Sequence, residues 1–442
     1  MSLPGVIEIL PLRDPVQADL TIPGSKSITN RALVLAALAR GRTVLSGALW
    51  SEDTQVMVEN LRLLGMTVEL TPDPEDVCNR TITVERTGGG MPQGGTERSP
   101  LDLYVGNAGT AARFLAALVC LGAGVFRLHG TARMHERPQS GLFDALRQLG
   151  YRIEAVGDRL PAVIHGTGPR PGRCAIGLKQ SSQFASALLL SGTMGGWQVQ
   201  VLEDDSEESS YVHMTRELCR VFPQSGGRFQ IEPDASSASY FWAAAAMVPG
   251  GPGLAVSPVD SSRFPVPIGS SEITIRHWPN SGWQIDSRFP AFLPLPTELS
   301  RARDLGDSIM TAMVLAPLSP HPVRFTDLGR LRVQECERVR AMRTELIRCG
   351  ARVQEQGDVL EVFPSSLAGT LIETYNDHRV AMAFSVLGLR VPGLKIRNPD
   401  CVKKTFPNFY RKLVAPPPHG LGAVVRDPKT NRLLTETELM AE

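Results

Sequence analysis

Lysine and arginine residues recur just after turns rich in glycine, serine and asparagine. Lys26 lies in such a turn at residues 23–27, and Arg31 follows it in an apolar run with helical spacing. Backbone N–H groups at a helix start attract anions, and a neighbouring cation strengthens that attraction. The pattern predicts sites for phosphate or carboxylate groups, with an ordinary solvated side chain as the alternative at each position. The cations concerned are Lys26, Arg31, Arg113, Arg137, Arg338, Arg379, Lys403 and Lys404.

Four carboxylates and one histidine could move protons beside these cations, because paired carboxylates among cations suit proton transfer on an anionic substrate. Asp307 opens an apolar segment and could simply cap a helix, whereas Glu335 stands close to Arg338 and could form a structural ion pair. The sequence contains no Walker phosphate loop, HExxH motif, serine hydrolase elbow or dinucleotide GxGxxG fingerprint. The candidates are Asp53, Asp307, Glu335, Asp377 and His378.

Two kinds of segment must position these residues. Residues 54–70, 140–156 and 339–356 each read as an amphipathic helix, a glycine stop and an alternating strand, which indicates repeated α/β modules. A second kind opens with a polar turn and continues as a small-residue helix that is apolar nearly all round and therefore buried. These helices follow turns at residues 23, 106, 179, 234, 305 and 375. Their polar starts could converge on one cleft between two similar domains.

Length and composition narrow the class of protein. With 442 residues the chain should form two or more domains, and a formal net charge of +1 predicts no general attraction to nucleic acid or membranes. No apolar run could span a bilayer, and the first residues lack the pattern of a targeting segment. Seven scattered cysteines without CxxC pairs are typical of a cytoplasmic protein.

Nine motifs in chain order resemble those of the 5-enolpyruvylshikimate-3-phosphate synthase family, over about residues 5–412. Three of them, containing HERP, ECERV and CVKKTFPNF, are most similar to the version inside the fungal pentafunctional arom polypeptide. The motifs are PGSKSITNRA, GNAGTAARFL, MHERPQSGLFDAL, KQSSQFASALL, PDASSASYFWAAAA, LGDSIMT, RVQECERV, TYNDHRVAMAFS and VKKTFPNF.

The resemblance implies an α/β fold of two similar domains, each built of repeated βαβαββ units, with the active site in the cleft between them. One domain would comprise residues 1–24 and 234–415, with 249–303 divergent, and the other residues 25–233, with its last unit shortened. Residues 416–442 begin with a proline run and read as a C-terminal appendage outside the core. Residues 86–100 read as a glycine-rich loop.

The same resemblance implies a transferase of the shikimate pathway, which leads to chorismate and the aromatic amino acids. It would move the enolpyruvyl group of phosphoenolpyruvate to the 5-hydroxyl of shikimate-3-phosphate and release phosphate. No cofactor or metal is implied, the partners are these two small anions, and a monomer is expected.

Site residues carry over by motif. Lys26, Asp307, Glu335 and His378 would be catalytic, with Asp307 and Glu335 as the acid/base pair. Domain closure on the anions would exclude water. Phosphoenolpyruvate would be bound by Lys26, Asn107, Gly109, Thr110, Arg137, Gln183, Arg338, Arg379 and Lys404. Shikimate-3-phosphate would be bound by Ser27, Arg31, Ser181, Ser182, Gln183, Asp307 and Gln334.

The chain departs from the family pattern on the side that would bind the acceptor. Gln334 replaces the lysine expected before the glutamate, which should raise the pKa of Asp307 and weaken substrate binding. Arg330 replaces an asparagine, and Glu208 and His213 replace a serine and an acid. The strand-rich piece before Asp234 is shortened, and the helix with a QGD motif is missing from 249–303.

Two other functions stay open. An intact phosphoenolpyruvate clamp with an altered acceptor side would suit an enolpyruvyl transferase that acts on another hydroxylated compound. Incomplete repeat units would instead suit a catalytically silent homologue that serves as a binding module. The UDP-N-acetylglucosamine enolpyruvyl transferases use a loop cysteine as acid, and no cysteine lies between residues 130 and 138.

Overall fold

The computed structural model describes residues 3–86, 90–202, 209–248 and 271–441. They form two compact units. We call Pro23–Glu232 the inserted unit, and Met1–Ile22 together with Pro233–Glu442 the flanking unit. The division expected from the sequence, after residues 24 and 233, lies close to these bounds.

The described strands of the inserted unit form two four-stranded sheets with one pattern and a smaller third sheet. They are β3 (Thr43–Leu49), β4 (Met66–Pro72), β5 (Asn79–Arg86), β6 (Leu101–Tyr104), β7 (Ala123–His129), β8 (Arg152–Ala155), β9 (Ala162–Thr167), β10 (Gly172–Gly177), β11 (Trp197–Leu202) and β12 (Gly227–Gln230). The sheets β12–β3–β5–β4 and β6–β7–β9–β8 each join a parallel pair to two antiparallel strands. The parallel pair β10–β11 stands alone, where the sequence predicts a shortened unit.

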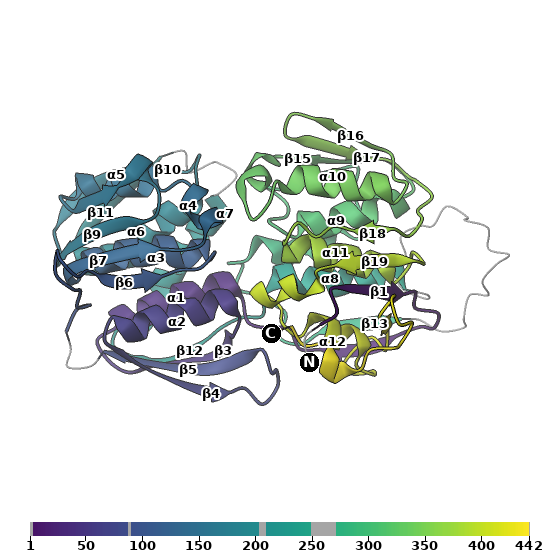
Figure 1. Cartoon of the computed structure of the whole chain (residues 1–442), viewed down its shortest axis with the longest axis horizontal. Coiled ribbons are helices and arrows are strands. Elements are labelled where there is room, and N and C mark those ends of the chain that lie inside the picture. The colour runs from purple at the N-terminus through teal and green to yellow at the C-terminus, as the bar shows by residue number, and fades with distance from the viewer. Residues whose placement is uncertain (1–2, 87–89, 203–208, 249–270, 442) are drawn as a thin grey trace. The chain divides into compact units, whose positions relative to one another are not determined.

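Three helices of the inserted unit are buried along most of their length and contact one another: α1 (Lys26–Leu38), α3 (Gly109–Cys120) and α6 (Ser182–Gly195) (Figure 1). Their many alanines and glycines permit close packing. Amphipathic helices cover them or the sheets, namely α2 (Glu52–Leu63), α5 (Ser140–Gln148) and α7 (Ser209–Val221). The short elements are α4 (Ala132–Glu136) and η2 (Val156–Asp158).

The described strands of the flanking unit follow the same scheme. They are β1 (Val6–Leu10), β2 (Gln17–Leu20), β13 (Glu272–Ile275), β14 (Glu298–Ser300), β15 (Val323–Thr326), β16 (Val353–Gln356), β17 (Val359–Val362), β18 (Leu371–Ile372), β19 (Leu394–Arg397) and β20 (Val424–Arg426). The sheets β14–β15–β17–β16 and β18–β19–β1–β20 again join a parallel pair to two antiparallel strands. The pair β2–β13 is parallel and two-stranded.

The core of the flanking unit is built around α8 (Ala235–Met247), α9 (Ile309–Leu315) and α11 (His378–Gly388), which pack on one another. With α1, α3 and α6 they confirm the six predicted buried helices. The amphipathic helix α10 (Arg338–Arg348) also agrees with prediction. The remaining elements are α12 (Phe409–Val414), η4 (Ile285–Phe292), η5 (Ala316–Leu318), η6 (Gly329–Val333), η7 (Pro399–Lys404) and η8 (Glu436–Glu438).

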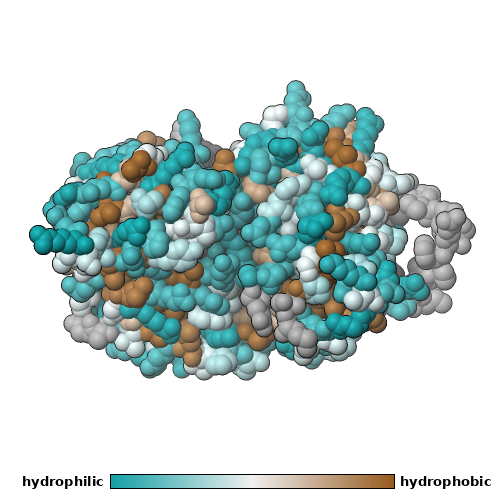
Figure 2. Space-filling view, in the orientation of Figure 1, coloured by the Kyte–Doolittle hydropathy of each residue, from teal (hydrophilic) through white to brown (hydrophobic). Residues whose placement is uncertain are grey.

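Apolar side chains are largely internal. On the face drawn in Figure 2, hydrophilic residues cover most of the surface and hydrophobic ones are dispersed among them. No helix in the described part of the chain is long and apolar enough to cross a bilayer.

The expectation that residues 416–442 form an appendage outside the core is wrong. Strand β20 pairs antiparallel with β1, with Ile9 opposite Val425, and Arg426 forms a salt bridge with Glu8 at 2.9 Å. Leu421, Val425, Leu434 and Leu439 are buried in the core of the flanking unit. Strand β20 therefore covers the edge of β1 by pairing with it, and the apolar side chains of the tail pack into the core.

Only part of the divergent span 249–303 is described, because residues 249–270 lie outside the described residues. Residues 271–303 contain β13, η4 and β14, and Ile273, Phe289 and Leu299 are buried. The sequence lacks the family's helix with a QGD motif in 249–303, and the 3-10 helix η4 occupies part of this span. Residues 90–100 are also tied down, because the Gly94 and Gly95 N–H groups donate to carbonyls of β7.

Candidate functional site

Lys26 opens α1 in the inserted unit and is held by a carboxylate. Its Nζ lies 3.1 Å from Oδ2 of Asp53, which stands in the first turn of α2. The Asp53 side chain is 5% exposed and that of Lys26 is 16% exposed. Asp53, a candidate acid or base from the sequence, is therefore placed where it orients Lys26.

Arg31 is buried one turn further along α1 and is fixed from several sides. Its Nη1 donates to the Ser27 carbonyl at 2.9 Å, its Nε to Thr215 Oγ1 at 2.7 Å and its Nη2 to Ser186 Oγ at 3.0 Å. The guanidinium also lies over the Phe114 ring, 5.4 Å from its centroid. Helices α6 and α7 thus set its position through hydroxyl groups.

Gly109 opens α3 beside two guanidinium groups. A Cβ at this position would come within 2.7 Å of Arg137 Nη2 and 2.7 Å of Arg113 Nη1, so glycine lets both approach the helix start. Arg113 Nη1 donates to the Gly109 carbonyl at 3.0 Å, and Arg137 Nη1 to the Asn107 carbonyl at 3.4 Å. Thr110 follows in the first turn and is 8% exposed.

The start of α6 carries the predicted serine pair. Ser181 caps the helix, because its Oγ accepts from the Gln183 N–H at 3.2 Å. Ser181 and Ser182 are each 2% exposed. The Gln183 Oε1 is shielded from solvent and has no hydrogen-bond partner among the described residues. A carbonyl oxygen in that state is ready to accept from a ligand hydroxyl.

In the flanking unit, Arg338 joins the carboxylates. It opens α10 and its side chain is 1% exposed. Its Nε lies 2.7 Å from Asp377 Oδ2, and its Nη2 lies 2.8 Å from Glu335 Oε2. Burial alone would lower the pKa of the Arg338 guanidinium, but the carboxylates of Asp377, Glu335 and Asp307 raise it well above its usual range. The group is a permanent cation.

Glu335 and Gln334 lie beside this arginine. The other oxygen of Glu335, Oε1, lies 3.1 Å from Lys404 Nζ at the end of η7. The Gln334 Oε1 accepts a hydrogen bond from Arg338 Nη1. The Gln334 amide therefore contacts Arg338 and adds no charge beside it.

Asp307 lies among three arginines. Its carboxylate is 3.1 Å from Arg379 Nη2, 3.4 Å from Arg301 Nη2 and 3.8 Å from Arg338 Nη1. Burial alone would raise the pKa of Asp307, but Arg379, Arg338 and Arg301 outweigh burial and lower it well below its usual range. Gln334 contributes no charge, and three guanidinium groups face this carboxylate. Asp307 is ionised at neutral pH.

The start of α11 places His378 and Arg379 next to Asp377. His378 is 1% exposed, with Nδ1 3.7 Å from Asp377 Oδ1. The Arg379 Nη1 donates to Ser236 Oγ at 2.5 Å, which connects α11 to α8. Asp377 caps α11 through the Arg379 N–H and also binds Arg338, so it is a structural anchor.

Sequence reasoning missed three buried polar residues near Asp307. Arg301 follows β14, and Asp286 in η4 accepts from the Ser308 N–H at 2.8 Å. Burial, with a contribution from the Asp307 charge, raises the pKa of Asp286. Gln284 accepts from the Ala235 N–H at 3.0 Å and so fixes the start of α8. All three lie in 271–303, where hydrophobic periodicity is poor. The sequence signal for this polar cluster is the spacing of Gln284 and Asp286, with one residue between them.

The remaining residues singled out from the sequence lie as follows. Glu208 lies outside the described residues, and His213 is exposed on α7. Arg330 lies in η6 and Lys403 pairs with Asp400 at 2.7 Å.

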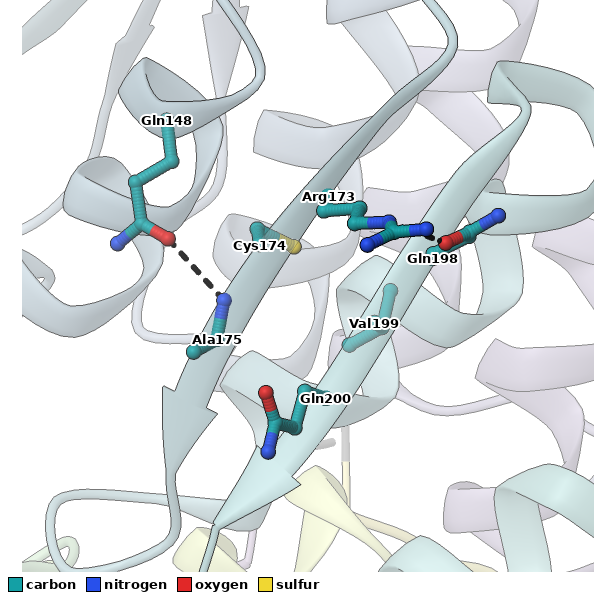
Figure 3. A pocket seen from close by; sticks show the side chains of 7 residues that line it. All are labelled: Gln148, Arg173, Cys174, Ala175, Gln198, Val199 and Gln200. Carbon is teal, nitrogen blue, oxygen red and sulfur yellow. Dashed lines mark hydrogen bonds between the residues drawn. The ribbon is translucent and has the colours of Figure 1, made fainter.

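A shallow cavity of about 540 Å³ lies on the two-stranded sheet of the inserted unit. In Figure 3 the Gln148 Oε1 accepts a hydrogen bond from the Ala175 N–H at 3.1 Å. The Arg173 Nε on β10 donates to the Gln198 Oε1 on β11 at 2.7 Å. None of its lining residues is a predicted site residue, so we do not assign the reaction to this cavity. The lining is Gln148, Arg173, Cys174, Ala175, Gln198, Val199 and Gln200.

Each unit, taken by itself, presents cations at buried helix starts. In the flanking unit, Arg338, Arg379 and Lys404 hold the carboxylates of Asp307 and Glu335. Such an arrangement can bind a small ligand that carries phosphate and carboxylate groups. The carboxylate pair can then exchange protons with it.

Comparison with known proteins gives the family. Residues 12–413 match the family model for EPSP synthase (3-phosphoshikimate 1-carboxyvinyltransferase). The chain is 38% identical to the 3-phosphoshikimate 1-carboxyvinyltransferase of Opitutus terrae, over 93% of this chain and 98% of that protein. It is 37% identical to the enzyme of that name from Pseudomonas syringae pv. syringae, over 93% and 97%.

Solved structures give the same fold. EPSP synthase from Acinetobacter baumannii matches with a TM-score of 0.68 at 22% identity, covering 96% of this chain and 100% of that one. The enolpyruvyl transferase NikO from Streptomyces tendae matches with a TM-score of 0.64 at 16% identity, covering 97% and 99%. The fold is therefore the α/β enolpyruvyl transferase fold, and the chain belongs to the EPSP synthase family.

Proposed function

We propose that this protein transfers the enolpyruvyl group of phosphoenolpyruvate to the 5-hydroxyl of shikimate-3-phosphate and releases phosphate. The reaction belongs to the shikimate pathway to chorismate and the aromatic amino acids. The observation that carries the proposal is the carboxylate pair on either side of one buried arginine: Arg338 contacts Glu335 at 2.8 Å and Asp307 at 3.8 Å. Acid and base are thus fixed beside a cation that can hold a substrate carboxylate.

The proposed binding of phosphoenolpyruvate uses five cations. Arg338 and Arg379 take its carboxylate, and Lys404, Lys26 and Arg137 take its phosphate. The ligand competes with carboxylates already in place, because Lys404 is paired with Glu335 and Lys26 with Asp53. When the phosphate draws Lys404 away, Glu335 loses one of its cationic neighbours and can take part in proton transfer as the acid. The helix start at Asn107, Gly109 and Thr110 contributes N–H groups.

The proposed binding of shikimate-3-phosphate uses hydroxyl, amide and cationic groups. Ser27, Arg31, Ser181 and Ser182 lie at the starts of α1 and α6 in the inserted unit. Gln183, whose Oε1 has no hydrogen-bond partner in the described part of the chain, contacts both substrates. Asp307 and Gln334 of the flanking unit face the acceptor hydroxyl.

The chemistry runs through a tetrahedral intermediate. Glu335 gives its proton to the methylene carbon as the enol C=C electrons form the new C–H bond. The 5-hydroxyl oxygen bonds to the central carbon and loses its proton to Asp307, which is ionised among its arginines. A methyl proton then returns to the Glu335 carboxylate, the C=C bond re-forms and the C–O bond to phosphate breaks. The leaving phosphate takes up the proton that Asp307 accepted, which restores both carboxyl groups to their starting states. His378 and Lys26 help to neutralise charge during these steps.

Phosphate release in the presence of both substrates tests this proposal. Release should require both of them, and Asp307→Asn and Glu335→Gln should each lower kcat by about 10²–10⁴-fold. Glu373→Gln is the matched control, since Glu373 forms a surface pair with Arg397. Absence of phosphate release by the wild-type protein would refute the proposal.

A second candidate is transfer to a different hydroxylated acceptor. It is favoured by Gln334, whose amide contacts Arg338 and brings no charge to the acceptor side. Phosphate release with another hydroxylated acceptor, but not with shikimate-3-phosphate, would support it. Calorimetric binding of the phosphoenolpyruvate pair without turnover would instead indicate a silent binding module.

We also propose a cytoplasmic monomer. Its seven cysteines are all free, which suits a reducing compartment. Light scattering would test the monomer. The wording of HERP, ECERV and CVKKTFPNF supports a relationship to the fungal arom version, which a phylogeny would test.

A further inference from the structure

Arg301 is fixed by a tight turn after β14. Its backbone N–H donates to the Thr326 carbonyl at 3.1 Å in the neighbouring strand β15. The Ser300 carbonyl accepts from the N–H groups of Asp304 at 3.0 Å and Leu305 at 3.2 Å, which closes the turn. The position of Arg301 is therefore set by the backbone of the flanking unit.

The guanidinium of Arg301 is turned inward onto Asp307. Its side chain is 1% exposed, and Nη2 lies 3.4 Å from Asp307 Oδ1. A guanidinium removed from water needs a carboxylate, because an uncompensated buried charge is strongly unfavourable. By contrast, Arg303, two residues later in the same turn, is 69% exposed and lies 3.6 Å from Glu298.

The two other arginines at Asp307 have competing partners. Arg338 also contacts Glu335 and Asp377, at 2.8 and 2.7 Å. Arg379 also donates to Ser236. In the proposed reaction both arginines also bind the substrate carboxylate. Each then stabilises the Asp307 charge less, at the step in which Asp307 must remain ionised.

Acidic groups near Asp307 make this requirement stricter. Asp286 faces it from η4 and Glu335 from the segment before α10, and both disfavour a negative charge on Asp307. The cations that face it come from three separate elements. The charged groups around the carboxylate are Asp286, Arg301, Glu335, Arg338 and Arg379.

We propose that Arg301 is a positioning residue that keeps the Asp307 carboxylate ionised and oriented while Arg338 and Arg379 bind the substrate. The inference rests on the proposed role of Asp307 as acceptor of the hydroxyl proton. Arg301 touches neither substrate in this scheme and acts through Asp307.

The pH dependence of kcat/KM tests the proposal. Loss of the cation in Arg301→Gln favours the protonated form of Asp307, so the acidic limb of the profile should move about 1–3 pH units upward. KM for phosphoenolpyruvate at neutral pH should stay within about threefold of wild type, since Arg338 and Arg379 remain. Arg301→Lys keeps the charge and should keep the wild-type limb. Arg303→Gln, in the same turn but exposed, is the matched control.

The outcomes separate this inference from the proposed reaction. A folded Arg301→Gln protein with the wild-type acidic limb overturns it, as does a Lys variant that shifts as far as the Gln variant. If Arg301→Gln does not fold, the double variant Arg301→Gln/Asp307→Asn decides. Recovery of folding supports the pairing, and continued failure overturns it. Full activity of Asp307→Asn alone would refute the role of Asp307 itself.

Discussion

Arg338 is the residue on which most of the flanking site depends. Asp377, Glu335 and Asp307 all approach its guanidinium, and Gln334 accepts from it as well. Removing the cation would leave three carboxylates facing one another in a buried place. The residue therefore serves stability before any ligand arrives.

Arg338→Met should lower the free energy of unfolding by about 3–5 kcal/mol, because it leaves buried carboxylates without their shared cation. Urea unfolding measures the change. Arg340→Met on the exposed face of the same helix is the control and should stay within about 0.5 kcal/mol of wild type. Equal stability of the two variants would contradict this account.

Gln334→Lys tests the acceptor side. A cation in place of the amide adds a charge-assisted hydrogen bond to the acceptor, which at about 1.5–3 kcal/mol should lower KM for shikimate-3-phosphate about tenfold or more. KM for phosphoenolpyruvate should change little. Gln334→Met, which has similar length and no charge, is the control. If both variants give the same KM, residue 334 does not contact the acceptor.

At the level of elements, the start of α3 is shaped by a missing side chain. Gly109→Ala places a methyl group 2.7 Å from the ends of Arg113 and Arg137, which are flexible enough to move away. The fold should survive, and KM for phosphoenolpyruvate should rise about tenfold or more as Arg137 is displaced from the ligand phosphate. Steady-state kinetics and thermal unfolding measure both effects. Gly5→Ala is the control, since a Cβ there meets nothing within 4 Å; a normal KM for Gly109→Ala would contradict the placement.

The C-terminal tail is an integral element. Deleting residues 416–442 uncovers the edge of β1 and exposes Leu421, Val425 and Leu434, each worth about 1.5–3 kcal/mol when buried. The truncated chain should therefore unfold at a much lower temperature or be insoluble. Arg426→Ala, which removes the pair with Glu8 and a hydrogen bond to Asn431, should have a far smaller effect. A truncated protein with wild-type thermal stability would show that the tail is dispensable.

Elements with a strong repeating pattern were predictable, and those without one were not. The six buried helices announce themselves by a polar turn followed by continuous small apolar residues, so Lys26, Gly109 and Asp307 could be placed at helix starts from sequence. Arg301 and Asp286 could not be placed, because a three-residue strand and a 3-10 helix are too short for periodicity to register. The prediction for the tail was wrong because a proline run usually marks a chain end outside the core. The three-residue strand β20 that follows it forms only by pairing with β1.

At the level of the whole molecule, several cysteine thiols and tyrosine hydroxyls are buried in apolar surroundings. Burial raises the pKa of the Cys349 and Cys401 thiols to about 12, and burial raises that of Tyr240 to about 12 despite the nearby Arg379. In the unfolded chain the thiols ionise from about pH 8.5. These groups therefore stabilise the fold fully below that pH and lose their contribution as pH rises toward 12.

The melting temperature in reducing buffer should accordingly fall steadily between pH 8.5 and 11, after little change between pH 7 and 8. A Cys349→Ala/Cys401→Ala variant should show a shallower fall, because two of the linked groups are gone. A constant melting temperature up to pH 10.5 would contradict the burial of these thiols.

The pairing of β1 with strands near the other end of the chain has a consequence for synthesis. Val6 lies opposite Arg397 and Ile9 opposite Val425, so the first strand leaves the ribosome long before its neighbours exist. The inserted unit is one continuous stretch and can fold in the meantime, since domains generally fold as they emerge. An apolar strand that waits unpaired is prone to aggregate. We therefore expect the nascent chain to rely on chaperones until translation is nearly complete.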